Sequence, residues 1–226
     1  MNFVEGEILL IDKPLDWTSF DVVNKLKVAL KKKYGRLKIG HAGTLDPKAT
    51  GLLIVCTGKK TKEIESIQNT DKVYTGTFYL GATTPCYDTE QAIDARFDIS
   101  TITAQQVYEN AHSFLGEQEQ FPPAHSAVKI NGKRAYDLAR AGKEVPVKSK
   151  TINIKKFEIT RIEFPVIDFY VECTKGTYIR SLAHDFGKRM DNGAYLAALR
   201  REKIGDYDVI DALQIDSIME IIYSEQ

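Results

Sequence analysis

Apolar residues recur along the chain with two different periods, and these periods separate predicted strands from predicted helices. Gly6 to Asp12 runs into an apolar stretch that stops at Lys13-Pro14, and Lys72 to Leu80 is rich in β-branched and aromatic residues, so both predict strands. Thr18-Ser19-Phe20-Asp21 precedes apolar residues at helical spacing, which predicts a capped amphipathic helix. Gly51 to Thr57 fits a short buried strand or a helix, and a further helix is expected to run through Ile67.

The second half of the chain mixes the same two patterns without a regular strand–helix–strand rhythm. Thr103 to Phe114 has helical periodicity, with Thr103 as a plausible N-cap. The other expected elements are a hairpin over Lys129–Lys133, strands over Thr151–Arg161 and Phe164–Thr174, and helices over Arg134–Ala141, after Lys175-Gly176, over Ala194–Arg201 and over Ile215–Ile222. This intermingling predicts an α+β fold around a mixed sheet, with no clear domain boundary.

One segment stands apart from these elements, the run Gly40-His41-Ala42-Gly43-Thr44-Leu45-Asp46-Pro47-Lys48-Ala49-Thr50-Gly51-Leu52-Leu53. It holds a single carboxylate, Asp46, among glycines that permit close approach of a ligand or another backbone. Pro47 biases Asp46 away from helical geometry, so the carboxylate sits at a sharp change of direction. Taken alone, the Asp-Pro pair is typical of a helix N-cap, and the alternative is a presented nucleophile.

Composition and charge narrow the class of protein. The 226 residues suffice for one sizeable domain or a domain with an insertion, and no apolar stretch approaches a membrane span. The acidic N-terminus lacks the basic start of a signal peptide, and the three cysteines and four histidines form no ligand-spaced group, so we expect a cytoplasmic protein that needs no metal or cofactor. Formal net charge is zero, yet six of the 31 acids lie in 206–226, where there is no Lys or Arg. The first 205 residues therefore carry 31 basic against 25 acidic groups, which fits a solvated face and, taken alone, only weakly favours a nucleic-acid partner.

The run around Asp46 closely resembles the catalytic motif of the TruB-type tRNA pseudouridine synthases, over more than a dozen consecutive positions. Other segments that resemble the family are Gly6–Pro14 with Thr18-Ser19, Lys72-Val73-Tyr74, Lys175–Leu182, Leu199-Arg200-Arg201 and Phe121–Arg140. The resemblance implies the pseudouridine synthase fold, with a mixed, mostly antiparallel sheet flanked by helices and an inserted thumb. It also implies isomerisation of the uridine at position 55, in the T-arm of tRNA.

Roles for individual residues follow from the resemblance. Asp46 matches the essential catalytic residue, Tyr74 the tyrosine that stacks on the target base, and Arg180 the arginine that pairs with the catalytic carboxylate. Tyr178 and Leu199 would line the pocket, His41 would hold the flipped nucleotide, and Lys13-Pro14 would support the catalytic loop. Lys175 stands at the start of the motif that carries Arg180. Basic thumb residues, among them Lys129, Arg134 and Arg140, would contact RNA phosphates.

The chain also departs from the family pattern in two places. Thr84-Pro85-Cys86-Tyr87-Asp88 stands where many members have a Thr-Asp-Thr run followed by an acid, which puts one polar contact in doubt although Asp88 remains. The acidic stretch 206–226 is too short for the small RNA-binding PUA-like domain that many members carry. We therefore expect one catalytic domain over 1–226, with a thumb at roughly 121–150, that acts as a monomer on the tRNA stem-loop.

The chemistry fits a lone carboxylate, because the isomerisation is redox-neutral and a carboxylate attacks covalently without a cofactor. Attack at C1′, attack at C6 and assisted elimination to a glycal all stay open. Two other functions compete: a non-catalytic RNA-binding or RNA-folding protein, and a synthase for a different RNA. A nucleotide-dependent phosphotransferase is excluded, because Gly51 to Thr61 has the wrong spacing for a phosphate-binding loop.

Overall fold

A computed structural model describes residues 1–123, 129–130, 133–134 and 148–224, which divide into two compact units. Unit 1 comprises residues 1–74 and 199–226, and unit 2 comprises residues 75–198. Two strands, β4 (Lys72–Leu80) and β12 (Ala194–Ile204), contribute residues to both units. None of the described helices is long and apolar enough to cross a membrane.

Unit 1 is built on strand β3 (Ala49–Thr57), which pairs antiparallel with β1 (Ile8–Lys13) and with β2 (Ile39–His41). The end of β12 pairs with β3 in parallel, with Leu199 opposite Ala49, and then antiparallel with β13 (Tyr207–Asp208). Four helical segments complete this unit: α1 (Ser19–Tyr34), the 3-10 helix η1 (Gly58–Glu63) followed by α2 (Ile64–Gln68), the short η2 (Val209–Asp211) and α6 (Ile215–Ser224).

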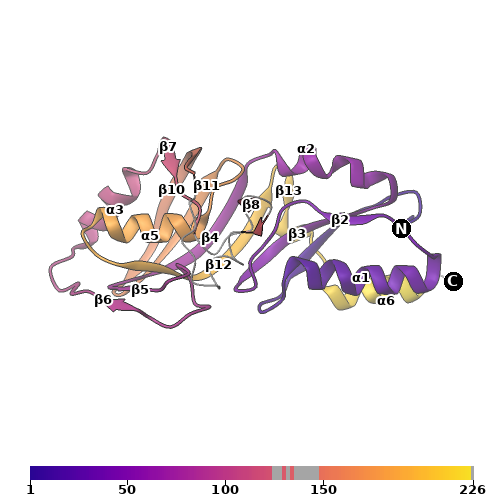
Figure 1. Ribbon diagram of the computed structural model, residues 1–226, viewed down its shortest axis with the longest axis horizontal. Helices are drawn as coiled ribbons and strands as arrows, with labels where there is room; N and C mark the ends of the chain where they lie inside the picture. The colour runs from indigo at the N-terminus through magenta and orange to yellow at the C-terminus, as the bar shows by residue number, and fades with distance from the viewer. Residues whose placement is uncertain (124–128, 131–132, 135–147, 225–226) are drawn as a thin grey trace. The chain divides into compact units, whose positions relative to one another are not determined.

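The two faces of β1 and β3 bury different cores, because side chains alternate across a strand. Leu9 and Leu53 point to the face covered by α1 and α6, which pack side by side (Figure 1). Leu52 and Ile54 point to the opposite face, against Ile67 of α2. Burial on both faces explains the continuous apolar run of β3.

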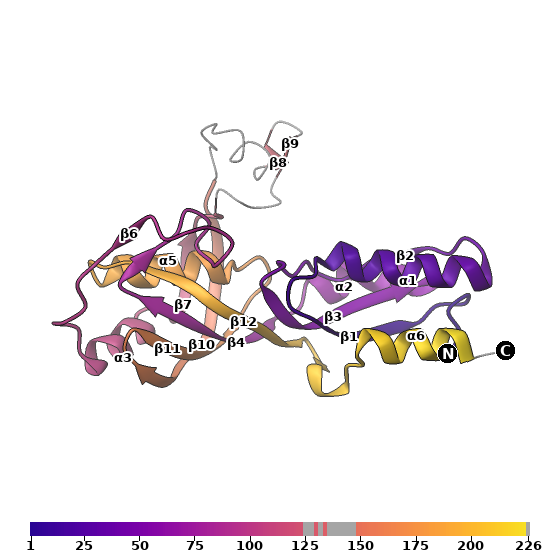
Figure 2. The ribbon, with the colours of Figure 1, turned by 90° about the horizontal axis from the view of Figure 1, so that it is seen from below.

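Unit 2 is an antiparallel sheet in the order β4, β11 (Val166–Cys173), β10 (Lys150–Glu163) and β7 (Gly116–Gln120). Helices α3 (Ala104–His112) and α5 (Ile179–Arg189) cover one face, as Figure 1 shows. A cluster of aromatic rings fills the space between sheet and helices: Phe78, Phe114, Phe157, Phe169 and Phe186. Two short antiparallel pairs are not hydrogen-bonded into this sheet: β5 (Ala82–Thr83) with β6 (Ala95–Arg96), and β8 (Lys129–Ile130) with β9 (Lys133–Arg134), the latter two labelled in Figure 2.

Most predicted elements are confirmed, including the α+β class. Thr18 and Thr103 both form capping boxes at the starts of α1 and α3. The helix predicted over Ala194–Arg201 is wrong, because this segment is strand β12. Its Ala and Leu residues favour a helix only weakly, and pairing with β3 and β13 outweighs that preference. The predicted hairpin at 129–133 is confirmed by the pairing of β8 with β9; Arg134 belongs to β9, and the rest of the helix predicted over Arg134–Ala141 lies outside the described residues.

Candidate active site

Asp46 lies in the connection between β2 and β3 of unit 1, with its side chain half-buried. The Ala49 amide donates to the Asp46 carbonyl over 3.1 Å, which closes a tight turn, and strand β3 begins at once. No helix starts here, so the N-cap interpretation of Asp46-Pro47 is wrong. The turn instead places a carboxylate at the N-terminal end of a buried strand.

Ser19 and Lys13 anchor the residues on either side of Asp46. The buried Ser19 hydroxyl donates to the Leu45 carbonyl over 3.2 Å and accepts from the Leu45 amide over 2.8 Å. Lys13 is fully buried, and its Nζ donates to the carbonyls of Pro14 (2.9 Å) and Pro47 (3.5 Å). The expectation that Lys13 supports this loop is therefore confirmed.

The charge of Lys13 is costly at this position. Burial lowers the pKa of Lys13 from 10.5 to about 8, and the negative charge of Asp46 opposes that shift. The buried ammonium of Lys13 and the half-buried carboxylate of Asp46 therefore attract each other. At neutral pH Lys13 still carries its proton.

Arg201 on β12 reaches the same loop and is only 2% exposed. Its Nη2 donates to the Gly43 carbonyl (3.1 Å) and its Nη1 to the Thr44 carbonyl (3.3 Å). Its Nε donates to the Leu52 carbonyl over 2.8 Å, and its side chain is also hydrogen-bonded to that of Tyr74. Burial lowers the pKa of Arg201, while Tyr74 first and then Asp46 oppose the shift.

The structure brings four of the predicted site residues to this part of unit 1. Tyr74, 8% exposed, is joined to the loop through Arg201, and half-buried Leu199 pairs with Ala49. His41 ends β2, and its Nδ1 is buried with no hydrogen-bond partner among the described residues. Burial lowers the pKa of His41, aided by the positive charge of Arg201 and opposed by the Gly43 backbone, so the imidazole is neutral at pH 7.

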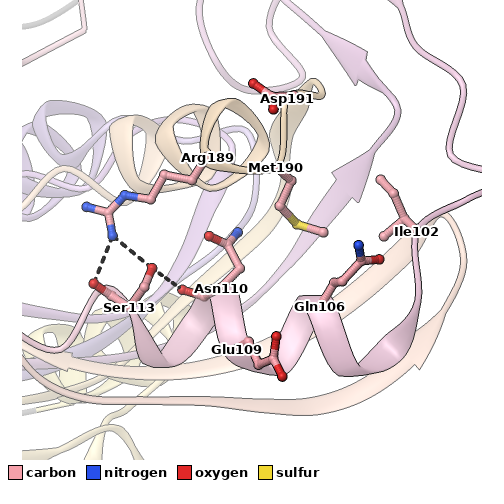
Figure 3. Close-up of a pocket in the computed structure, with 8 residues that line it drawn as sticks. All are labelled: Ile102, Gln106, Glu109, Asn110, Ser113, Arg189, Met190 and Asp191. Atoms are coloured by element: carbon pink, nitrogen blue, oxygen red, sulfur yellow. Dashed lines mark hydrogen bonds between the residues drawn. The ribbon is translucent and has the colours of Figure 1, made fainter.

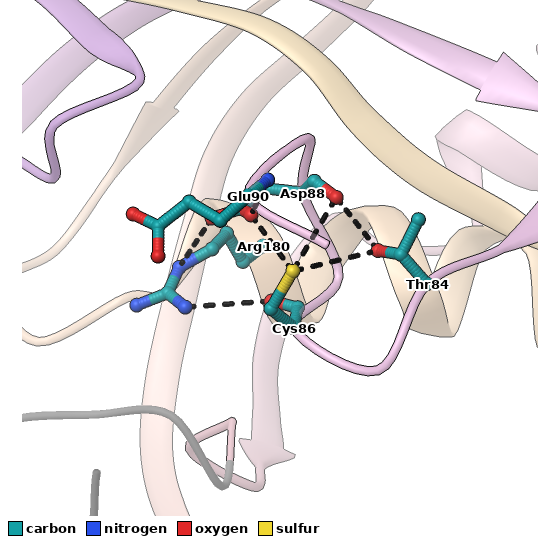
Figure 4. A network of polar contacts seen from close by, with 5 residues as sticks. All are labelled: Thr84, Cys86, Asp88, Glu90 and Arg180. Carbon is teal, nitrogen blue, oxygen red and sulfur yellow. Dashed lines mark hydrogen bonds and ion pairs between the residues drawn. The ribbon is translucent and has the colours of Figure 1, made fainter. Parts of the chain in front are cut away.

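Arg180 lies in unit 2, at the start of α5, and is 7% exposed. Its Nε lies 3.6 Å from Oδ2 of buried Asp88, and its Nη1 donates to the Cys86 carbonyl over 3.4 Å (Figure 4). The Asp88 carboxylate also accepts from the Cys86 thiol at 2.9 Å and from the Glu90 amide at 2.8 Å. Asp88 thus makes a buried ion pair despite the unusual sequence before it. The pairing of Arg180 with Asp46 stays a prediction.

Cys86 acts here as a protonated donor. Burial, and then the hydrogen bond to Asp88, raise the pKa of its thiol. Thr84 donates to the Asp88 carbonyl over 2.7 Å, so the loop is fixed through both backbone and side chains. The segment 84–88, which departs from the family pattern, therefore forms a connected network of hydrogen bonds.

Tyr178 and Lys175 precede α5 in the same unit. The Gln120 side chain makes two hydrogen bonds to the backbone of Tyr178: its Oε1 accepts from the Tyr178 amide (2.7 Å) and its Nε2 donates to the Tyr178 carbonyl (3.0 Å). Lys175 is exposed. Lys129 and Arg134 face each other across β8 and β9, and Arg140 lies outside the described residues.

A cavity of about 550 Å³ opens between α3 and the end of α5, and no predicted site residue is among the residues that line it (Figure 3). Arg189, on its wall, donates to Ser113 and Gln118 and lies 3.5 Å from the centre of the Phe114 ring. Asn110 donates to the Phe186 carbonyl over 2.9 Å. These groups join the two helices to each other and to the sheet.

Sequence reasoning missed the parts played by Arg201 and Gln120. A run of two arginines is normally read as a solvated face, and only Arg200 fits that description, through its ion pair with Asp12 at 2.9 Å. Adjacent residues of a strand point to opposite faces, but the helix predicted over 194–201 hid that signal. Nothing in the sequence marked Gln120.

Comparison with known proteins identifies the family that the sequence matches. Residues 31–179 match the model of the TruB family pseudouridylate synthase N-terminal domain. The chain is 56% identical over 217 residues to tRNA pseudouridine synthase B of Flavobacterium johnsoniae, covering 95% of each chain. It is 50% identical over 222 residues to the enzyme of that name from Phocaeicola vulgatus, covering 97% of this chain and 94% of the relative.

Solved structures give the same fold. The chain superposes on a chain of the Cbf5-Nop10-Gar1 complex with a TM-score of 0.73 at 26% identity, covering 99% of this chain and 56% of that one. An archaeal box H/ACA sRNP Nop10-Cbf5 complex gives a TM-score of 0.69 at 23% identity, covering 98% and 55%. Because the family model spans most of the sequence and the curated relatives match nearly all of it, the chain belongs to the TruB family of pseudouridylate synthases.

Proposed function

We propose that this protein isomerises a uridine in the T-arm of tRNA, at position 55, to pseudouridine, with Asp46 as the catalytic carboxylate. The observation that carries the proposal is the loop around Asp46, which is held from three directions by Ser19, Lys13 and Arg201. Relatives that cover nearly the whole chain are named tRNA pseudouridine synthase B, which supports tRNA as the substrate.

The reaction rearranges bonds within one nucleotide. The C1′–N1 bond breaks, a C1′–C5 bond forms, the proton leaves C5, and N1 gains a proton. A carboxylate that attacks the nucleoside needs no cofactor for these steps. A fixed loop keeps the attacking oxygen oriented, and orientation of this kind accounts for a large part of many enzymatic rates.

Further residues complete the proposed site. Tyr74 would stack on the target base, and Arg180 would pair with Asp46 and hold it ionised. The buried ion pair of Arg180 with Asp88 supports this role, since it fixes the guanidinium at one end. His41, Leu199, Tyr178 and Lys175 would contact the nucleotide, and the neutral imidazole of His41 suits a holding role better than proton transfer.

RNA recognition would involve the catalytic domain and its thumb, roughly residues 121–150. Lys129, Arg134 and Arg140 would contact phosphates there. We further propose that the protein acts as a monomer in the cytoplasm, without a metal or cofactor, because its substrate is tRNA and the proposed chemistry requires neither.

Mapping of the product tests the choice of RNA. The protein is incubated with unmodified tRNA transcript, with an isolated T-arm hairpin and with an anticodon-arm hairpin of the same tRNA as a matched control. The account predicts pseudouridine at one T-arm position in the first two RNAs. Modification of the anticodon hairpin alone would point to another RNA target, and binding without product would favour a non-catalytic RNA-binding protein.

A further inference from the structure

Arg201 is the largest side chain of unit 1 that is almost entirely enclosed, and it carries a positive charge. Enclosing a charge is expensive unless hydrogen bonds replace the lost water. Here all of the nitrogens have partners: carbonyls of Gly43, Thr44 and Leu52, together with the side chain of Tyr74. The cost of burying the guanidinium charge is thus offset by hydrogen bonds to the Asp46 loop with the adjoining strand β3, and to Tyr74 on β4.

These contacts have a definite pattern. Gly43 and Thr44 lie three and two residues before Asp46, and Tyr74 is the proposed base platform. The planar guanidinium therefore connects the backbone that carries the carboxylate to the aromatic side chain. Its fixed fork of donors matches partners in several directions at once, which the single ammonium of a lysine cannot do.

We propose that Arg201 is a positioning residue that sets the geometry of Asp46 and Tyr74 relative to each other, acting through the loop carbonyls and the Tyr74 hydroxyl. This role rests on the proposed function. With the guanidinium in place, attack on the nucleoside and stacking of the base occur in one fixed arrangement. Arg201 needs no contact with RNA for this.

Arg201→Lys tests the proposal, because it keeps the charge and removes the fork. A shift of about 1 Å at a reacting group costs up to about 100-fold in rate, so we expect the single-turnover rate at saturating tRNA to fall roughly 10- to 100-fold. The Kd for tRNA should change less than about threefold on the same grounds. Arg200→Lys is the matched control: it alters the neighbouring residue, whose partner is Asp12, and should leave both values unchanged.

A double-mutant cycle with Tyr74→Phe separates positioning from a general structural role. If Arg201 acts through the Tyr74 hydroxyl, the two substitutions together slow the reaction clearly less than the product of their separate effects. Fully multiplicative effects, a wild-type rate for Arg201→Lys, or weakened tRNA binding with an unchanged rate would each overturn the proposal.

Two further readouts keep the outcomes distinct. If Arg201→Lys loses its cooperative unfolding transition, Tyr74→Phe alone carries the test: a reduced rate with intact tRNA binding supports the link, and a full rate overturns it. A wild-type protein that makes no pseudouridine in any tRNA would instead refute the proposed function. The inference about Arg201 fails if the wild type is active and Arg201→Lys is equally active.

Discussion

Lys13 gives the protein a pH dependence of stability that can be calculated from its site. Its ammonium is fully buried, and burial lowers its pKa to about 8, against 10.5 for the exposed group. In the unfolded chain Lys13 therefore keeps its proton up to a higher pH than in the folded protein. Between these two values the unfolded state binds more protons, so stability rises with pH. The gain in the free energy of unfolding is complete above the pKa that Lys13 has in the unfolded chain. It is lost as the pH falls through the pKa that Lys13 has in the folded protein.

The size of the effect follows from the shift. Since one pKa unit corresponds to about 1.36 kcal/mol, the full difference amounts to roughly 3.4 kcal/mol, and about 2.5 kcal/mol of it develops between pH 7 and pH 10. Lys13→Met removes the titrating group while keeping a long apolar chain. The free energy of unfolding of wild type minus that of Lys13→Met should therefore increase by about 2.5 kcal/mol over this range.

Urea unfolding at pH 7 and pH 10 measures this difference. Lys27→Met removes one positive charge from an exposed position and controls for the overall change in net charge. Its difference from wild type should stay nearly constant. A change below about 0.5 kcal/mol for Lys13→Met would refute the reasoning, because the buried ammonium would then cost little.

Two further predictions concern strand β3, which follows the Asp46 loop, and the loop of unit 2 that carries Asp88. Gly51 has φ +97°, and an added Cβ would lie 2.3 Å from the Arg201 carbonyl oxygen, whereas Gly35 has φ +79° and open space around it. Gly35 also has ψ −160°, a backbone region that is essentially restricted to glycine, so Gly35→Ala should cost about 1–3 kcal/mol of backbone strain. Gly51→Ala should cost clearly more in urea unfolding, because the added Cβ would also collide with the Arg201 backbone; equal losses would contradict the close approach. Cys86→Ala deprives the Asp88 carboxylate of a donor and should cost about 1 kcal/mol of unfolding free energy, which Cys86→Ser should largely restore. Equal stability of the Ala and Ser variants would show that this hydrogen bond contributes nothing.

Local patterns sufficed for much of the fold. The capping residues Thr18 and Thr103 marked two helix starts, and the apolar periods located β4, β10, β11, α5 and α6. These features depend on residues close together in the sequence. The helix predicted over 194–201 was wrong for the opposite reason. The composition of this segment alone favours a helix, but its secondary structure is decided by pairing with β3, which is far away in the chain.

The candidate site divides in the same way. The several glycines and the proline around Asp46 mark an unusual run in the sequence, but its expected catalytic role came only from the resemblance of that run to the family motif. Support of its loop by Lys13 was expected from the resemblance alone, and the supports from Ser19 and Arg201 could not be predicted, since their partners are mostly backbone carbonyls and amides. Every residue offers those groups, so sequence carries no sign of which ones a buried side chain will reach.

The rate of pseudouridine formation by Asp46→Asn shows whether Asp46 is the catalytic carboxylate. Asparagine keeps the size and hydrogen-bonding shape of the side chain but removes the charge and the nucleophilic oxygen. With tRNA tritiated at C5 of uridine, release of tritium follows formation of the C1′–C5 bond. The account predicts release by the wild type and none above background by Asp46→Asn, with tRNA still bound by the variant. Equal release by both proteins would contradict the assignment of Asp46.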